Sequence, residues 1–204
     1  VLLGGVSAMF TSCGDFLDQE SDRVISADKD RLNAASDTLY SVIGIMNKLQ
    51  ALSDRTILLG ELRGDLSEVQ DIASADLREL ANFNISTENK YNAPRDYYAV
   101  INNCNYFLAK ADTMVKNSKN ERIFAKEYAA VKAFRAWTYL QLVLNYGKVP
   151  LITTPILTKD DADRQYEMKD IQGICNYFVS DIAPYANVET PNYGTIRGND
   201  SKLF

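Results

Sequence analysis

The chain of 204 residues contains no histidine. Histidine is the commonest general base and the commonest metal ligand, so its absence excludes any Ser-His or Cys-His nucleophile within these residues. A phosphate-binding glycine loop and metal-ligand spacings are also missing. Acidic groups such as Glu61 with Asp65, or Asp160 with Asp161 and Asp163, leave a carboxylate hydrolase as an alternative. Nothing in the sequence places these acids in an apolar pocket, so we expect a non-enzyme with no cofactor and no metal.

The sequence has fewer basic than acidic residues. Lysine and arginine together number 22, against 27 acidic residues, which gives a formal net charge of −5. The sequence has no basic stripe that would neutralise phosphates, so nucleic acid is excluded as a partner.

The cysteines number three, which does not make an even disulfide framework. Cys104 and Cys175 lie in amphipathic helical patterns, which favours small core residues. A disulfide between them in an oxidising compartment is the alternative.

The apolar run at the start of the chain is too short to span a bilayer. We expect residues 1–12 to be the remnant of a signal peptide, since small residues precede Cys13 as a processing site requires. Phe10-Thr11-Ser12-Cys13 resembles a lipobox, which predicts lipidation of Cys13. Residues 13–27 are acidic and poor in apolar side chains, so they are expected to form a solvated tether. A buried N-terminal strand is the alternative for the apolar run.

The stretch from Glu127 to Leu151 predicts a central helix and its end. With residues about 100° apart, apolar side chains cover most of its circumference, so neighbouring helices must pack on several sides. Gly147 is expected to end this helix and Pro150 to prevent its resumption. We therefore predict an all-α domain over residues 28–204.

Arg135 stands in the middle of an apolar stripe of this central helix. A buried guanidinium without a partner is costly, so we expect a structural ion pair, with Glu61 or Asp65 as the first candidates. Direct contact with a ligand is the alternative. Trp137, in the same helix, is expected to be a packing residue.

Two further helices are predicted before the central one. The first covers about 28–52, and the second begins at Pro94 and continues to about Asn117, forming an antiparallel hairpin with the central helix. Asn102 and Asn105 are poor helix formers in mid-helix. Their side chains are therefore expected to tie the backbone of neighbouring segments, with ligand contact as the alternative.

Residues 53–92 have weak periodicity and include Arg63 and Asp65. Long irregular segments in compact domains often carry function, so both are candidate ligand or partner contacts. Tyr91 and Tyr193 lie in turn-rich segments and present flat faces suited to a sugar ring, which makes them candidates too.

Several motifs together resemble the N-terminal half of the SusD/RagB family of surface lipoproteins from Bacteroidetes-type bacteria. The residues are Tyr98-x-x-Ile101-Asn102-x-x-Asn105, then Ala133-Phe134-Arg135-Ala136-x-x-Tyr139, then Tyr146-Gly147-x-Val149-Pro150-Leu151. Supporting matches are Ser12-Cys13-x-Asp15-Phe16-Leu17 at the tether, residues 35–44, and residues 168–186 with Asp181-Ile182.

The resemblance implies a solenoid of tetratricopeptide-like helical hairpins, truncated at the C-terminus, although no strict 34-residue repeat is visible. It also implies a lipid-anchored, outward-facing outer-membrane protein that captures oligosaccharides for a SusC-like TonB-dependent transporter. Family members are not enzymes. The starch-binding member stacks aromatics on sugar in a loop region that corresponds here to residues 66–82, which contain no aromatic.

Other functions stay open at this level. One branch of the family takes peptides, and a helical-repeat scaffold that binds only protein is a further alternative. The segment 152–165 is expected to be a solvated loop or an edge that contacts the transporter barrel. The 204 residues alone are expected to expose apolar surface and to fold poorly.

Overall fold

The structure, a computed structural model, describes residues 32, 34–64, 66–112, 116, 118, 120 and 124–188. Its helices are α1 (Ala35–Gln50), α2 (Ser53–Glu61), α3 (Ala75–Ala81), α4 (Pro94–Lys110), α5 (Ala125–Tyr146), α6 (Lys159–Asp163) and α7 (Ile171–Ile182), with a 3-10 turn at Ala183–Tyr185. Two short strands, β1 (Val149–Pro150) and β2 (Met168–Lys169), pair antiparallel. The predicted all-α class is confirmed. The predicted signal remnant and tether, residues 1–27 with Cys13, lie outside the described residues.

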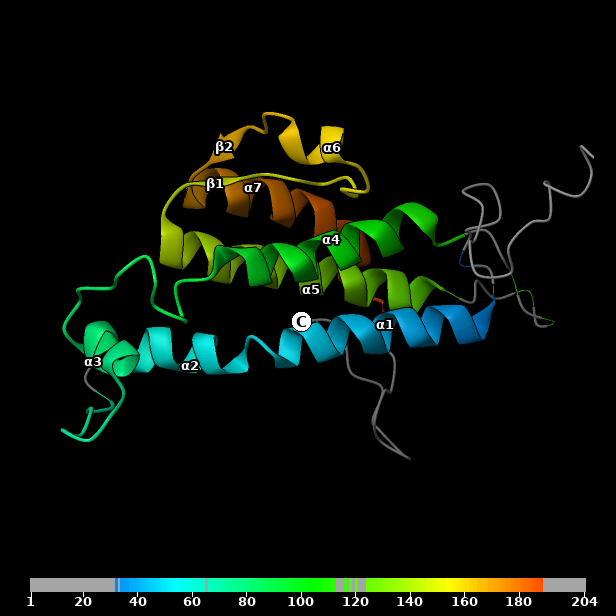
Figure 1. Ribbon diagram of the computed structural model, residues 1–204. Helices are drawn as coiled ribbons and strands as arrows, with labels where there is room; N and C mark the ends of the chain where they lie inside the picture. Colours follow the sequence, from blue (N-terminus) through cyan, green and yellow to red (C-terminus); the bar gives the residue numbers. More distant parts are fainter. Residues whose placement is uncertain are drawn as a thin grey trace, which may run out of the picture. The chain divides into compact units, whose positions relative to one another are not determined.

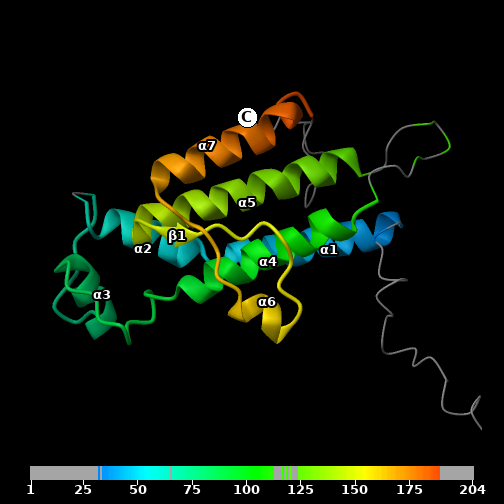
Figure 2. The same ribbon diagram turned by 90° about the horizontal axis from the view of Figure 1, so that it is seen from above.

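Helix α5 is the central helix, packed against α4, α7 and α1 (Figures 1 and 2). The apolar stripe predicted for it is buried, because Val131, Thr138 and Leu142 are fully covered. Helices α4 and α5 form the predicted antiparallel hairpin: Tyr97, near the start of α4, has its ring 6.3 Å from that of Tyr146 at the end of α5. Apolar faces at helical spacing thus account for the arrangement.

The described core has two clusters of buried apolar side chains. The larger one joins α1, α4, α5 and α7, and the smaller one joins α2 and α3 through Leu59, Leu62, Leu80 and Tyr91. The smaller cluster fixes the segment between α2 and α4, which the sequence alone predicted to be largely irregular. That prediction was wrong for α2 and α3.

Two predicted helix ends were also wrong. The helix expected over about 28–52 starts only at Ala35, after the extended Ala34, and it ends at Gln50, close to the predicted end. Helix α4 ends at Lys110 rather than near Asn117, because Ala111 adopts an extended conformation and bridges to Leu32. Backbone hydrogen bonds join Leu32 N to Lys110 O at 3.2 Å and Asp112 N to Leu32 O at 3.2 Å.

The end of α5 follows the sequence prediction. Gly147 has φ +76°, a conformation that side chains with a Cβ disfavour, and the chain then turns into β1. The segment 152–165, for which a solvated loop was expected, varies in solvent exposure along its length. Ile152 is buried, whereas α6 is exposed and is capped by Thr158 and Asp161. The first part is therefore held to the helices, and only the second is solvated.

Candidate functional site

The guanidinium of Arg135 forms an ion pair and a hydrogen bond within the protein. Its side chain is 4% exposed, and its Nη2 lies 2.9 Å from Asp181 Oδ2 on α7. Its Nη1 donates to Asn105 Oδ1 on α4 at 2.8 Å. The expected partner Glu61 was wrong, because the carboxylate comes from α7; Asp65 lies outside the described residues. A structural ion pair therefore fills this position.

The carboxylate of Asp181 also accepts a bond from Lys132 Nζ at 2.5 Å. Burial by itself raises the pKa of the Asp181 carboxyl. The hydrogen bonds and charges of Lys132 and Arg135 outweigh burial, so the pKa is lowered overall. The group thus joins α5 to α7 as an ionised acid.

The loop 150–156 is held down by side chains of α4 and α5. Asn102 exchanges two hydrogen bonds with the backbone of Ile156, at 3.1 and 2.7 Å. Asn105 Nδ2 donates to the carbonyls of Ile152 and Thr154, at 2.9 and 3.1 Å. Both asparagines therefore tie backbone.

Two tyrosines complete this attachment. The Tyr139 hydroxyl accepts from Ile152 N at 2.7 Å and donates toward Ile152 O at 3.0 Å. The Tyr98 hydroxyl donates to the carbonyl of Pro150 at 2.8 Å. Burial raises the pKa of both hydroxyls, so they stay protonated at any physiological pH. The side-chain amides and hydroxyls of these residues and both Nη atoms of Arg135 thus bond within the protein, while Arg135 Nε is buried with no hydrogen-bond partner among the described residues. None of these groups is open to a ligand at the surface.

Arg63 lies where two hollows meet, and we call these two hollows together the Arg63 cleft. The smaller hollow has a volume of about 140 Å³ and is lined by Leu59, Arg63, Ile85, Tyr91, Asn92, Asn145 and Tyr146. The larger has a volume of about 470 Å³ and is lined by Leu62, Arg63, Gly64, Ser67, Glu68, Val69, Gln70, Asp71, Arg78, Ala81, Asn82 and Phe83. The structure therefore brings together two residues singled out from the sequence, Arg63 and Tyr91. The other two, Asp65 and Tyr193, lie outside the described residues.

The guanidinium of Arg63 bridges α2 and α5. Its Nε donates to Leu59 O at 2.5 Å, and its Nη2 donates to Asn145 Oδ1 at 2.6 Å. Asn145 is oriented in turn by donating to Gln141 O at 2.8 Å. The side chain at the centre of the cleft is therefore held in place before any ligand arrives.

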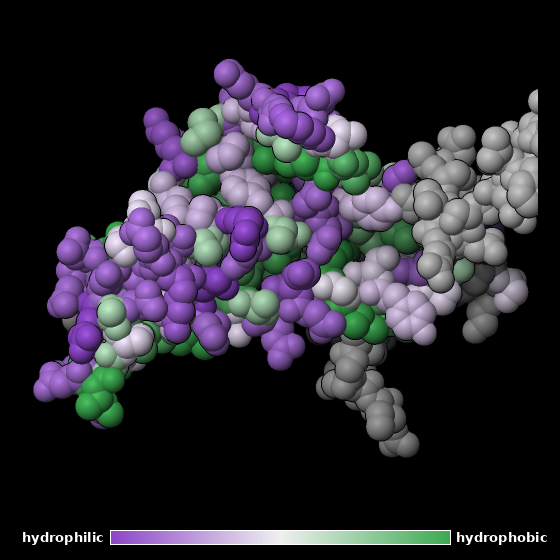
Figure 3. Space-filling model, in the orientation of Figure 1, coloured by the Kyte–Doolittle hydropathy of each residue, from purple (hydrophilic) through white to green (hydrophobic). Residues whose placement is uncertain are grey.

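Phe83 stands at the edge of the larger hollow. Its ring is 70% exposed, and its φ of 56° lies in the left-handed region that bulky residues rarely adopt. Strained backbone of this kind concentrates at functional sites. The surface over α2 and α3 is largely hydrophilic on the face shown in Figure 3. An isolated aromatic in a polar surround is suited to stack on a sugar ring.

The wall beyond Phe83 is fixed by Glu79. Its carboxylate accepts from Asn89 Nδ2 at 2.9 Å, Ser86 N at 3.0 Å and Ser86 Oγ at 2.8 Å. These bonds, first that of Asn89, lower the pKa of Glu79. The segment that carries Tyr91 is thereby fastened to α3. The Tyr91 side chain is only 9% exposed, and Lys90 Nζ lies 4.8 Å from its ring centroid, so it forms cleft wall rather than an open platform.

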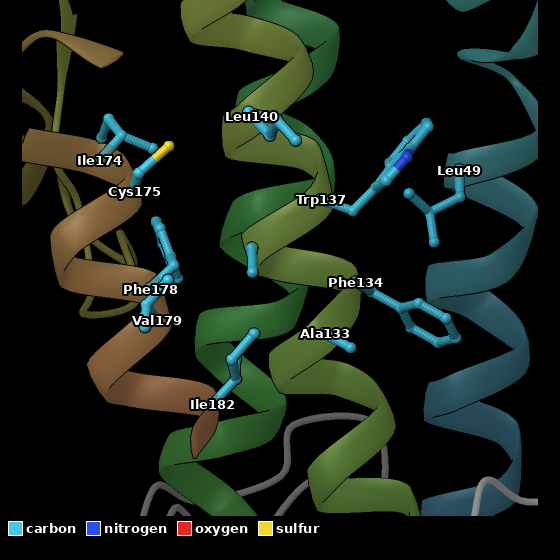
Figure 4. Close-up of a pocket in the computed structure, with 11 residues that line it drawn as sticks. Leu49, Ala133, Phe134, Trp137, Leu140, Ile174, Cys175, Phe178, Val179 and Ile182 are labelled. Atoms are coloured by element: carbon cyan, nitrogen blue, oxygen red, sulfur yellow. The ribbon is translucent and has the colours of Figure 1, made fainter. Parts of the chain in front are cut away.

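A second, wholly different surface lies over α5. Figure 4 shows a groove with α7 on one side, α1 on the other and α4 behind α5. Its volume is about 680 Å³, and its lining is Leu49, Ala133, Phe134, Ala136, Trp137, Leu140, Ile174, Cys175, Phe178, Val179 and Ile182. We call it the α5 groove. Trp137, expected to be packed, is 39% exposed there, and that expectation was wrong.

The structure also describes the cysteines and several of the acidic residues that the sequence singled out. Cys104 and Cys175 are free thiols. Asp161 caps α6, and Asp163 pairs with Lys159, so these acids have local roles. Within the described residues no group of three or more metal-ligating side chains occurs. No helix in the described part of the chain is long and apolar enough to cross a membrane.

Sequence reasoning missed Phe83 and the α5 groove. Phe83 was visible as a lone aromatic in a polar stretch, and that isolation was the available signal.

Comparison of the chain with protein-family models, curated proteins and solved structures gave no match.

Proposed function

We propose that this chain belongs to a lipid-anchored protein of the outer membrane that captures oligosaccharides at the cell surface. It delivers them to a SusC-like TonB-dependent transporter and catalyses no reaction. Cys13 carries the lipid, and several acyl chains on it make the anchoring lasting. The finer fold is a SusD-like solenoid of tetratricopeptide-like hairpins, of which α4 and α5 form one.

One observation carries this proposal. The residues on which the family resemblance rests are far apart in sequence, yet they interact as one network. Arg135 joins Asn105 to Asp181, while Tyr98, Asn102 and Tyr139 hold the loop after β1. A chance match in single helices would not be expected to meet in space, so the network supports a shared fold.

The Arg63 cleft supports the choice of oligosaccharides. Sugars are bound by polar groups that fix their hydroxyls and by flat apolar faces that cover their C–H groups. The cleft offers amide, carboxylate and guanidinium groups beside the exposed ring of Phe83. Its larger hollow, about 470 Å³, lies in the size range of small-molecule sites.

The test begins with the full-length, membrane-anchored protein. Mild solubilisation and affinity capture should recover a large TonB-dependent barrel, identified by mass spectrometry. Calorimetric titration with a glycan panel should then give binding that Phe83→Ala weakens about tenfold or more, while Phe83→Tyr retains it. Recovery of the protein alone would count against the transport role. Binding of peptides but of no glycan would show that the cargo is a peptide and not an oligosaccharide.

The α5 groove favours a second candidate, a helical scaffold that binds only protein. Among the described residues no charged side chain lines the groove, so its chemistry suits the apolar face of a helix. Absence of glycan binding in the full-length protein, together with protein partners lost on Val179→Lys, would favour this candidate.

A further inference from the structure

We infer that the Arg63 cleft is built for an acidic oligosaccharide, one that carries a carboxylate on the sugar. This inference rests on the proposed function, and it adds the class of glycan. It follows from the way the arginines of the described residues are neutralised.

Arg55, Arg95, Arg135 and Arg164 each lie within salt-bridge distance of an aspartate carboxylate. Arg63 and Arg78 have no such partner among the described residues. Both of them line the larger hollow of the cleft. In the described part of the chain, the two guanidinium groups without a carboxylate partner thus line the same hollow.

The bonds that Arg63 makes to described residues all go to neutral oxygens. They come from the Leu59 carbonyl and the Asn145 amide. Arg78 likewise donates to the backbone carbonyl of Asp71, at 2.9 Å, and not to its carboxylate. A half-buried cation bonded only to neutral groups attracts an anion more strongly than a solvated one, because less water screens it. Guanidinium and carboxylate also match in shape, since two parallel N–H···O bonds can form.

The acids of the cleft fit the same ligand. Glu68 and Asp71 line the larger hollow and are exposed. Sugar hydroxyls donate well to carboxylates, so these two acids suit the neutral part of the ligand. They disfavour a ligand that is anionic throughout. The chain carries a formal net charge of −5, so attraction of an anion has to be local, at Arg63 and Arg78.

A sugar acid suits the cleft better than an acidic peptide. Phe83 presents an exposed ring at the edge of the hollow that the two arginines line, and such a ring covers the C–H face of a sugar. The ligand would thus place its carboxylate at Arg63, its hydroxyls near Glu68 and Asp71, and one ring face on Phe83.

The test uses the full-length protein and pairs of ligands. A hyaluronan tetrasaccharide and sialyllactose, in which neutral sugars accompany the acidic ones, are each titrated beside a carboxyl-reduced, neutral counterpart. We expect at least one acid to bind about tenfold or more tightly than its neutral counterpart, with an affinity that falls as salt rises. Arg63→Gln and Arg78→Gln should abolish this preference. Arg95→Gln is the matched control, because Arg95 is 94% exposed and does not line the cleft, and it should leave the preference intact.

Arg63→Gln also removes a link to Asn145, so its melting temperature is measured in parallel. Arg78→Gln changes an exposed side chain and tests the inference even if Arg63→Gln does not fold. Equal binding of acidic and neutral forms, or a preference that survives in Arg78→Gln, would overturn the inference and leave oligosaccharide capture standing. Preference for acidic peptides over every acidic sugar would also overturn it. Failure of all glycans would remove the proposed cargo itself.

Discussion

Arg135 on α5 and Asp181 on α7 form a nearly buried ion pair, with 2.9 Å between Nη2 and Oδ2 and side chains 4% and 16% exposed. The guanidinium also lies 5.7 Å from the centroid of the Phe178 ring. Helix α7 is therefore joined to the hairpin of α4 and α5 by charge as well as by apolar packing.

Removing the acid should destabilise the protein strongly. In Asp181→Ala, the buried guanidinium of Arg135 loses its carboxylate, and the expected loss in the free energy of unfolding is about 3–5 kcal/mol. Urea denaturation followed by circular dichroism measures it. Asp163→Ala is the control, because it breaks the exposed pair with Lys159 and should cost less than about 1 kcal/mol. Equal losses would show that the buried pair has no special role.

The same carboxylate predicts a dependence of stability on pH. Its pKa is lower in the folded protein than the value of about 3.9 in an unfolded chain. Its stabilising contribution is therefore complete above about pH 5 and is lost as the pH falls through the folded-state pKa. The difference in unfolding free energy between wild type and Asp181→Asn should shrink between about pH 5 and pH 2. A difference that stays constant over this range would contradict the assignment.

The hydroxyl of Tyr139 should matter more than that of Tyr98. Tyr139→Phe leaves the N–H of Ile152 without its 2.7 Å acceptor, in a residue 7% exposed. We expect a loss of about 1–3 kcal/mol, the cost of an unsatisfied buried donor. Tyr98→Phe removes the donor to Pro150 O, a carbonyl of a residue that is only partly buried, so about 1 kcal/mol is expected. Thermal unfolding of the two variants in parallel decides between them, and a larger loss for Tyr98→Phe would reverse the assignment.

Two glycines should respond in opposite directions to the same change. An added Cβ would meet nothing within 4 Å at Gly147 or at Gly44, so space is not the difference. Gly147 has φ +76°, and Gly147→Ala should cost about 1–2 kcal/mol because of the backbone conformation. Gly44 lies inside α1, where Gly44→Ala should stabilise by about 0.5–1 kcal/mol. Differential scanning calorimetry on both variants should show melting temperatures shifted down and up, respectively.

Local features of the fold were predictable from the sequence. Pro94 occupies the first turn of α4, Gly147 ends α5, and the stripe with Val131, Arg135 and Leu142 is buried, because helix periodicity and end signals act over a few residues. That Arg135 needs a partner was also predictable, because it lies in an apolar stripe of the helix.

The identity of that partner was not predictable in the same way. Asp181 is 46 residues further along the chain, and only the packing of α7 on α5 brings it near. The Arg63 cleft has the same origin, since Arg63 and Asn145 are 82 residues apart. The prediction for residues 53–92 failed for a related reason. Helices α2 and α3 are short, and they are stabilised by a shared core rather than marked by strong periodicity.

The α5 groove has one consequence for how the protein can be studied. The chain contains a single tryptophan, and that residue, Trp137, stands in the groove with 39% of its surface exposed. Indole emission moves to shorter wavelength when water is withdrawn from the ring. The protein therefore carries its own optical reporter, and a blue shift of its intrinsic fluorescence would signal that this surface has become covered, without any label.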